Sequence, residues 1–105
     1  MQIGIDFGGT KIEAAALDAQ GHFITRIRTG NPGHYDAAVT TVRDLVQRVE
    51  AETGRRGTVG IGTPGSISPT TRLMRNSNSL YLNGRRFRED LSAAIELEDA
   101  DLLVE

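Results

Sequence analysis

The 105-residue chain contains no cysteine, so disulfides and zinc sites built from thiolates are excluded. It has no apolar run near the ~20 residues that a membrane-spanning helix requires. Its start lacks the charged segment and long apolar stretch of a secretory signal peptide. These absences predict a cytoplasmic protein with no membrane partner.

An excess of basic residues is also missing, because 12 Lys and Arg stand against 14 Asp and Glu, for a formal net charge of -2. Binding to a nucleic-acid backbone needs a basic field, so nucleic acid is not expected as a partner. Arg26 and Arg28 on one expected strand, and the group Arg85, Arg86 and Arg88, are interpreted as solvated charges.

The most informative feature is a loop between two apolar runs near the start of the chain. Its functional groups are a carboxylate, two glycines, a hydroxyl and an amine, on Asp6, Gly8, Gly9, Thr10 and Lys11. Glycines permit positive φ and let backbone N–H groups approach an anion, and a single carboxylate suits a hydrated Mg²⁺. The loop therefore indicates a phosphate site, although an ordinary hairpin turn explains it equally well.

Two familiar nucleotide-binding signatures are absent from the chain. It contains neither the G-x-x-x-x-G-K-[ST] pattern nor a G-x-G-x-x-G that opens a helix. A loop that joins one strand to the next is a different arrangement from both, so neither a P-loop nor a Rossmann nucleotide site is expected.

Hydrophobic periodicity predicts three strands, then a helix, then alternating strands and helices. The expected elements are strands 2–7, 11–18 and 22–29, a helix over 35–53, a strand over 58–63, a strand over 71–75, a helix over 87–96 and a strand over 101–105. Gly54 is placed to end the first helix. This order predicts an α/β domain with an antiparallel opening and later crossover connections.

Two further segments carry candidate binding residues. The strand over 58–63 is rich in glycine, which marks a close approach of a ligand or another backbone, and Gly65 and Ser66 follow at its carboxyl end. The segment 76–84 is dense in amide side chains such as Asn78, which suit the hydroxyls of a sugar. A Pro-Gly turn and an ordinary Asx-rich loop explain the same residues without a ligand.

Taken in order, these segments resemble one known family. They are Ile3–Lys11, Gly60–Gly65, and Asn76–Asn78 with Leu82–Gly84. Together they are similar to the N-terminal part of the ROK-family sugar kinases, and residues 56–69 look most like bacterial fructokinases of the manno(fructo)kinase type. The resemblance implies a ribonuclease H-like lobe of the actin–hexokinase–Hsp70 type, with a three-stranded antiparallel start followed by α-β-α-β.

The resemblance also implies an activity, the transfer of phosphate from ATP to the 6-hydroxyl of a hexose, with fructose favoured and Mg²⁺ as cofactor. The residues implied to contact the ATP phosphates are Asp6, Gly8, Gly9, Thr10 and Lys11, with Asp6 near the metal. Those implied to contact the sugar are Gly65, Ser66 and Asn78. Asn76 matches the family less securely, and Asn83 is expected to shape the loop.

The chain departs from the family at its end. The family's catalytic aspartate lies in an Asn-Asp-Ala-Asn stretch after a strand that ends like Leu103–Glu105. Residues 1–105 are therefore expected to be the N-terminal lobe of a two-lobe kinase, truncated before the catalytic base, with the structural zinc site further along. The isolated chain is expected to be inactive and prone to self-association, and the full-length enzyme to be a homodimer.

Two other functions stay open at this point. The family includes sugar-responsive transcriptional repressors, but these carry a helix-turn-helix before the glycine loop, and with a strand expected from residue 2 no such helix is expected here. The second alternative is that the chain is a non-catalytic ligand-binding half-domain.

Overall fold

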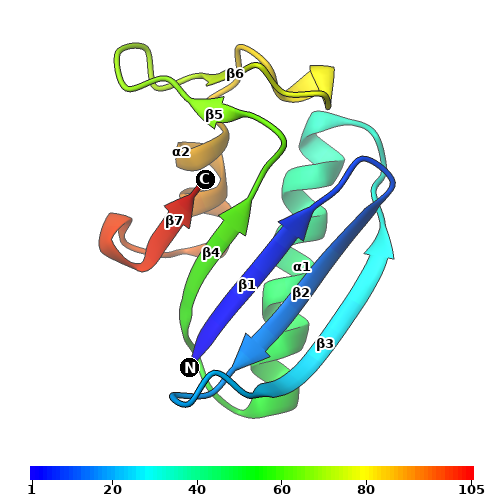
Figure 1. Cartoon of the computed structure of the whole chain (residues 1–105), viewed down its shortest axis with the longest axis vertical. Helices are drawn as coiled ribbons and strands as arrows, with labels where there is room; N and C mark the ends of the chain where they lie inside the picture. The colour runs from blue at the N-terminus through cyan, green and yellow to red at the C-terminus, as the bar shows by residue number, and fades with distance from the viewer.

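The computed structural model describes the whole chain apart from the side chain of Asp99, and its elements follow one another as Figure 1 shows. They are β1 (Gln2–Phe7), β2 (Lys11–Leu17), β3 (Phe23–Gly30), α1 (Tyr35–Thr53), β4 (Thr58–Gly62), β5 (Ser66–Ile67), β6 (Met74–Arg75), the 3₁₀ turn η1 (Leu80–Leu82), α2 (Phe87–Ile95), the 3₁₀ turn η2 (Asp99–Asp101) and β7 (Leu102–Val104).

Five of the strands form a mixed sheet in the order β3-β2-β1-β4-β7. The first three strands pair antiparallel, as the sequence predicts, whereas β1 pairs parallel with β4 and β4 parallel with β7. The carboxyl ends of β1, β4 and β7 therefore lie at one end of the sheet, which is also where the β1–β2 hairpin turns (Figure 1).

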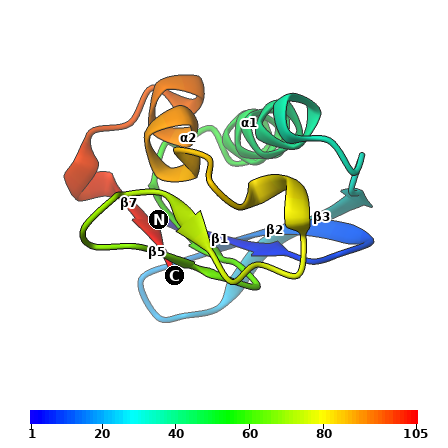
Figure 2. The same cartoon turned by 90° about the horizontal axis from the view of Figure 1, so that it is seen from above.

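Both helices cover the same face of the sheet, as Figure 2 shows. Alternate residues of each strand point to this face, and the apolar stripe of α1 meets them. The buried side chains include Ile3, Ile5, Phe7, Ile12, Val59 and Ile61 from the sheet and Val42, Leu45, Val49, Phe87 and Leu91 from the helices. The predicted bounds of α1 are confirmed, and Gly54 ends it in the left-handed region at φ 68°.

The expected strand over 71–75 is too long. Only Met74–Arg75 is a strand, and it pairs with β5 in a separate two-stranded sheet. The hydroxyl of Ser68 accepts hydrogen bonds from the N–H groups of Thr70 and Thr71, and Arg72 is left-handed at φ 65°. These residues form a turn, which shortens the strand. The sequence also did not predict β5, η1 or η2. The bounds of β1 are as predicted, and the ends of the remaining elements shift by at most one residue.

The helix-free face of the sheet is charged near the hairpin. Glu13 accepts hydrogen bonds from the exposed Arg26 and Arg28, at 2.7 and 3.0 Å from their terminal nitrogens, and these bonds hold the pKa of Glu13 below its usual value. Phe23 of β3 is 58% exposed, with the Arg26 guanidinium 4.7 Å from its ring centroid.

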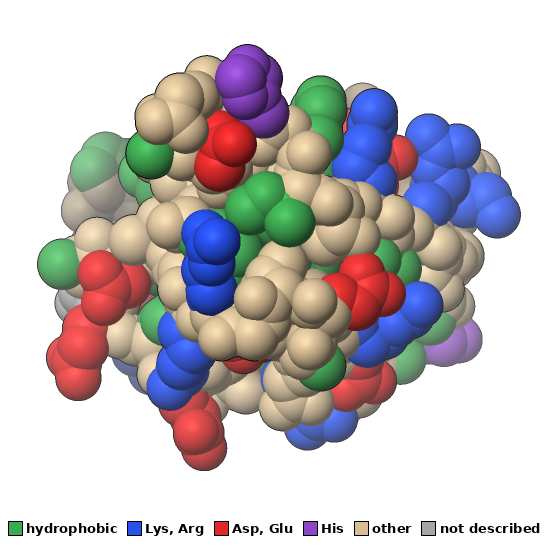
Figure 3. Space-filling view, turned by 90° about the horizontal axis from the view of Figure 1, so that it is seen from below, with side chains coloured by type: hydrophobic (Ala, Val, Ile, Leu, Met, Phe, Trp, Pro, Cys, Tyr) green, Lys and Arg blue, Asp and Glu red, His purple; other side chains and the backbone are tan. Residues whose placement is uncertain are grey.

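At the opposite end of the molecule, acidic and basic side chains lie interspersed (Figure 3). No helix within the described residues is long and apolar enough to cross a membrane.

Tyr35 at the start of α1 connects the two helices. Its hydroxyl donates a hydrogen bond to Asp90 of α2, and its ring packs edge-on against Phe87, with the centroids 6.2 Å apart. The Arg85 guanidinium lies 3.8 Å from the centroid of the Tyr35 ring. The pKa of Tyr35 is raised mainly by burial of the phenol and, to a smaller extent, by the hydrogen bond to Asp90.

We expect this tyrosine to make the fold sensitive to alkali. Folding raises the pKa of Tyr35 above its unfolded value of about 10. The contribution of Tyr35 to the free energy of unfolding is therefore fully present below pH 10 and is lost as the pH rises further. Urea unfolding between pH 8 and 11 should show a decline of up to ~1.4 kcal/mol per pH unit from this group. Tyr35→Phe should lower stability at pH 8 but flatten the alkaline decline, whereas Tyr81→Phe should keep it. Equal declines in wild type and Tyr35→Phe would contradict this assignment.

Candidate functional site

The glycine hairpin is closed by a hydrogen bond from the Gly8 N–H to the Lys11 carbonyl at 2.9 Å. A Cβ on Gly8 would lie 2.8 Å from that carbonyl oxygen, so a larger residue would force the hairpin open. Neither Gly8 nor Gly9 has a positive φ, contrary to the sequence-based reason given for them. Gly8 is required because the Lys11 carbonyl oxygen approaches it closely, whereas a Cβ on Gly9 would meet nothing within 4 Å.

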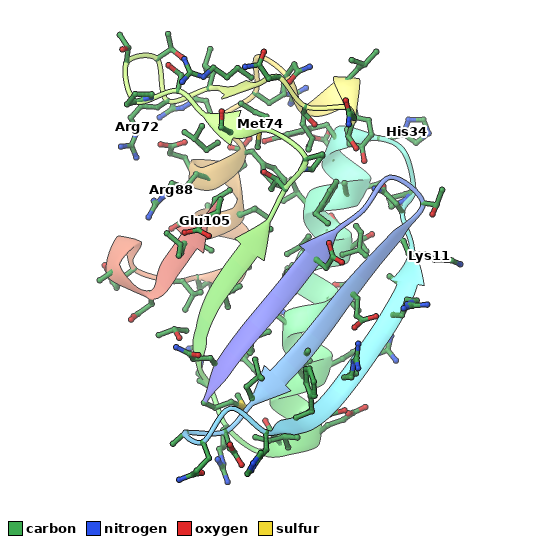
Figure 4. All side chains as sticks on the ribbon, in the orientation of Figure 1. Lys11, His34, Arg72, Met74, Arg88 and Glu105 are labelled. Carbon is green, nitrogen blue, oxygen red and sulfur yellow. The ribbon has the colours of Figure 1, made fainter. Side chains whose placement is uncertain are left out.

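The functional side chains of the hairpin are exposed. Thr10 and Lys11 lie at the tip, and Figure 4 shows Lys11 projecting away from the body of the molecule. Asp6 is exposed on the helix-free face at the end of β1, in register with Gly62 of β4. Neither Lys11 nor Asp6 takes part in the ion pairs formed among the described side chains. Both charges are available to a ligand.

These groups fit a phosphate chain with its metal. A hydroxyl, an ammonium and a glycine backbone are donors for phosphate oxygens, and Mg²⁺ accepts one carboxylate together with water and phosphate. Within the described part of the chain, no group of three His, Asp or Glu side chains forms a ready metal cage. Asp6 is an exposed carboxylate at the base of this hairpin.

The segments predicted to contact a sugar pack against each other. Ser66 pairs with Arg75 across the β5–β6 sheet, and a Cβ on Gly65 would lie 2.6 Å from the Arg75 carbonyl oxygen and 2.9 Å from the Ser77 nitrogen. Gly65 thus permits the contact between the two backbones. It brings exposed Ser66 and exposed Asn78 into one region of the fold.

The amides of the segment 76–84 divide into two kinds. The Asn83 side chain accepts a hydrogen bond from the Ser77 N–H at 2.9 Å and donates one to the Ser77 carbonyl at 3.1 Å. Asn83 therefore shapes the loop, as its sequence position suggested. Asn76 adopts the left-handed conformation at φ 60°, a turn geometry that asparagine tolerates. Asn78 is exposed, which leaves its amide accessible to a ligand.

Asn31, which the sequence analysis did not single out, connects the two regions. Its N–H donates to the Thr10 carbonyl at 2.9 Å, and its side-chain nitrogen donates to the Gly8 carbonyl at 2.8 Å. Its side-chain oxygen accepts from the Tyr81 hydroxyl at 2.9 Å. No sequence signal points to this contact, because 50 residues separate Asn31 from Tyr81.

A separate hollow of about 400 Å³ lies on the helix-free face and contains none of the predicted site residues. Its floor is formed by Gly4 of β1 and Gly60 of β4, and Leu103 of β7 lies at its side. The side chains that define the candidate site instead surround the carboxyl ends of β1 and β4.

The fold is of the actin–hexokinase type. A ROK family glucokinase from Streptomyces griseus, solved with glucose and AMPPNP, has this fold with a TM-score of 0.84 at 22% identity, covering 99% of this chain and 32% of that one. A ROK family transcriptional regulator, a homolog of the E. coli MLC protein, shares it with a TM-score of 0.72 at 11% identity over 97% of this chain and 26% of that one.

The chain belongs to the ROK family, whose model matches residues 2–99. It is 37% identical over 97 residues to an N-acetyl-D-glucosamine kinase from Pectobacterium carotovorum, and this alignment covers 91% of this chain and 32% of the relative. It is 38% identical over 93 residues to the N-acetylgalactosamine kinase AgaK from Shewanella, which covers 88% of this chain and 30% of the relative. The chain thus spans about a third of the length of these relatives.

Gly65 offers a direct test of the contact between the sugar-side segments. Gly65→Ala places a methyl group against two backbone atoms, so we expect it to destabilise the fold by ~1–3 kcal/mol. Gly60→Ala is the matched control, because a Cβ there meets nothing within 4 Å, and it should change stability by less than ~1 kcal/mol. Urea unfolding measures both, and equal losses in the two variants would show that backbone contact at Gly65 is not the cause.

Proposed function

We propose that the chain is the N-terminal lobe of an ATP-dependent sugar kinase that phosphorylates the 6-hydroxyl of a hexose. The observation that supports this proposal is the placement of the exposed glycine hairpin at the same end of the sheet as the Gly65–Ser66 and Asn78 segments. Phosphoryl transfer depends mainly on positioning and charge neutralisation. The hairpin would supply hydrogen-bond donors to the ATP phosphates, and the Ser66 and Asn78 side chains would supply them to the sugar.

On the nucleotide side, the Lys11 ammonium and the Thr10 hydroxyl would bind phosphate oxygens, with the backbone at Gly8 and Gly9 close against them. Mg²⁺, when bound, would supply positive charge that neutralises the charge developing on the phosphates. Asp6 would hold that metal through its water shell. The chain's own contribution is thus to bind and orient the phosphates.

On the sugar side, the Asn78 amide and the Ser66 hydroxyl would hydrogen-bond the ring hydroxyls, beside the close backbone approach at Gly65. Fructose is the acceptor implied by the resemblance of residues 56–69 to bacterial fructokinases. N-acetylated hexosamines are the competing acceptors, since the kinases related by sequence carry those names.

The catalytic base is expected outside residues 1–105. General-base assistance contributes about 10²–10⁴-fold to such reactions, and closure of a second lobe excludes water from the site. The phosphate- and sugar-binding residues of this chain would then act together with a catalytic base and a second lobe outside residues 1–105.

Comparison of the 105-residue chain with the full-length gene product tests this division of roles. We expect the gene product to phosphorylate hexoses with ATP and Mg²⁺, and the 105-residue chain to show no measurable turnover. A coupled ADP-release assay with fructose, mannose, glucose, N-acetylglucosamine and N-acetylgalactosamine measures both proteins and ranks the acceptors. Sugar binding by the full-length product without any phosphorylation would favour a repressor or a non-catalytic binding module instead.

Lys11 provides a sharp test of the phosphate site, because it is the only lysine in the chain. We expect Lys11→Gln in the full-length gene product to raise the KM for ATP by about 10- to 100-fold, the effect of losing one charge-assisted hydrogen bond. Stability should not change, since the side chain is exposed. Arg55→Gln, which removes an exposed cation at the far end of α1, is the control. An unchanged KM in Lys11→Gln would exclude the hairpin as the phosphate site.

A further inference from the structure

We propose that Asn31 is a positioning residue that orients the peptide units of the glycine hairpin toward the phosphates, and that Tyr81 holds Asn31 in place. The inference rests on the proposed function for its ligand, but its structural basis is independent of it. One side chain contacts the hairpin, the turn after β3 and η1.

The orientation of the Asn31 amide is fixed by two backbone groups, one of which can only accept a hydrogen bond and one of which can only donate. Its nitrogen faces the Gly8 carbonyl, which can only accept, and its oxygen faces the Gly33 N–H at 3.0 Å, which can only donate. A flipped amide would oppose donor to donor and acceptor to acceptor. The Tyr81 hydroxyl must therefore donate to the Asn31 oxygen, and the network has one arrangement.

The bonds from Asn31 determine which way the hairpin N–H groups point. In a planar trans peptide, the C=O and the N–H of one unit point in opposite directions. Because Asn31 draws the Gly8 carbonyl toward itself, the Gly9 N–H of that unit points away from Asn31. The bond from the Asn31 N–H to the Thr10 carbonyl directs the Lys11 N–H in the same way. N–H groups of a glycine loop that point to the same side favour an anion.

Tyr81 ties this support to a rigid part of the fold. It lies in η1 beside Leu82, whose side chain is fully buried, and two residues before Asn83, which is hydrogen-bonded twice to Ser77. The same 3₁₀ turn follows the segment that holds Asn78. The hydroxyl of Tyr81 thus links the phosphate-side hairpin to the sugar-side loop through a single side chain.

Amide NMR of the 105-residue chain tests the structural part. Asn31→Ala and Tyr81→Phe should both shift the Gly8–Lys11 resonances, and hydrogen exchange at the hairpin should accelerate by about 3- to 10-fold, as expected for one lost hydrogen bond. Tyr35→Phe is the matched control, because it removes a buried tyrosine bond between α1 and α2 and should leave the hairpin resonances unchanged. Hairpin resonances that do not respond to Asn31→Ala would overturn the inference.

Kinetics of the full-length gene product test the functional part. Asn31→Ala should raise the KM for ATP about tenfold and Tyr81→Phe about threefold, with the KM for the sugar unchanged within about twofold. Asn31→Asp keeps the acceptor for Tyr81 but loses the donor to Gly8, so it should match Asn31→Ala. Adding Tyr81→Phe to Asn31→Ala should have no further effect, because both substitutions break the same connection.

The possible failures are distinguishable. An active kinase whose KM for ATP is indifferent to Asn31→Ala would overturn this inference and leave the proposed function intact. A rise in the KM for the sugar equal to that for ATP would show general loosening of the fold and would also overturn it. A gene product with no kinase activity would overturn both the proposed function and the role of Asn31 toward phosphate.

Discussion

The parallel pairing of β1 with β4 is the constraint on which the rest of the structure depends. Ile3 and Ile5 of β1 lie in register with Val59 and Ile61 of β4, and all four side chains are buried beneath the helices. A slip of one residue would turn these side chains to the helix-free face, so the core fixes the register. That register sets the end of β1 beside the end of β4. The hairpin and the segment after β4 then start from neighbouring points, although more than fifty residues of chain separate them.

Two glycines turn this placement into a usable site through the space they leave. Gly8 allows the Lys11 carbonyl to lie where a Cβ would be, and Gly65 does the same for the backbone at Arg75 and Ser77. Both have negative φ, so steric access and not left-handed geometry explains them. The consequence is a tight hairpin with exposed donors on one side and a close pair of backbone segments on the other. Chemistry that relies on positioning needs such closely fixed backbones.

Much of the framework was predictable because it arises from local patterns. The bounds of α1, the left-handed Gly54 after it and the antiparallel opening follow from periodicity and glycine placement, and the structure confirms them. Prediction failed where polar side chains bond their own backbone. The Ser68 hydroxyl accepts hydrogen bonds from its own loop and Arg72 is left-handed, so the expected strand is only two residues long. Such local bonds compete with strand pairing and leave no hydrophobic period.

The sequence by itself determined the α/β framework, the ROK-family motifs and the residues exposed at the hairpin, because each depends on neighbours along the chain or on an ordered set of short motifs. The role of Asn31 was decided only by tertiary structure. Its bonds to Gly8, Thr10 and Tyr81 join three segments, and an asparagine before a proline looks the same in sequence whether or not it makes them. Hydrogen bonds between distant segments depend on where the packed core places each backbone, and that placement exists only in the folded chain.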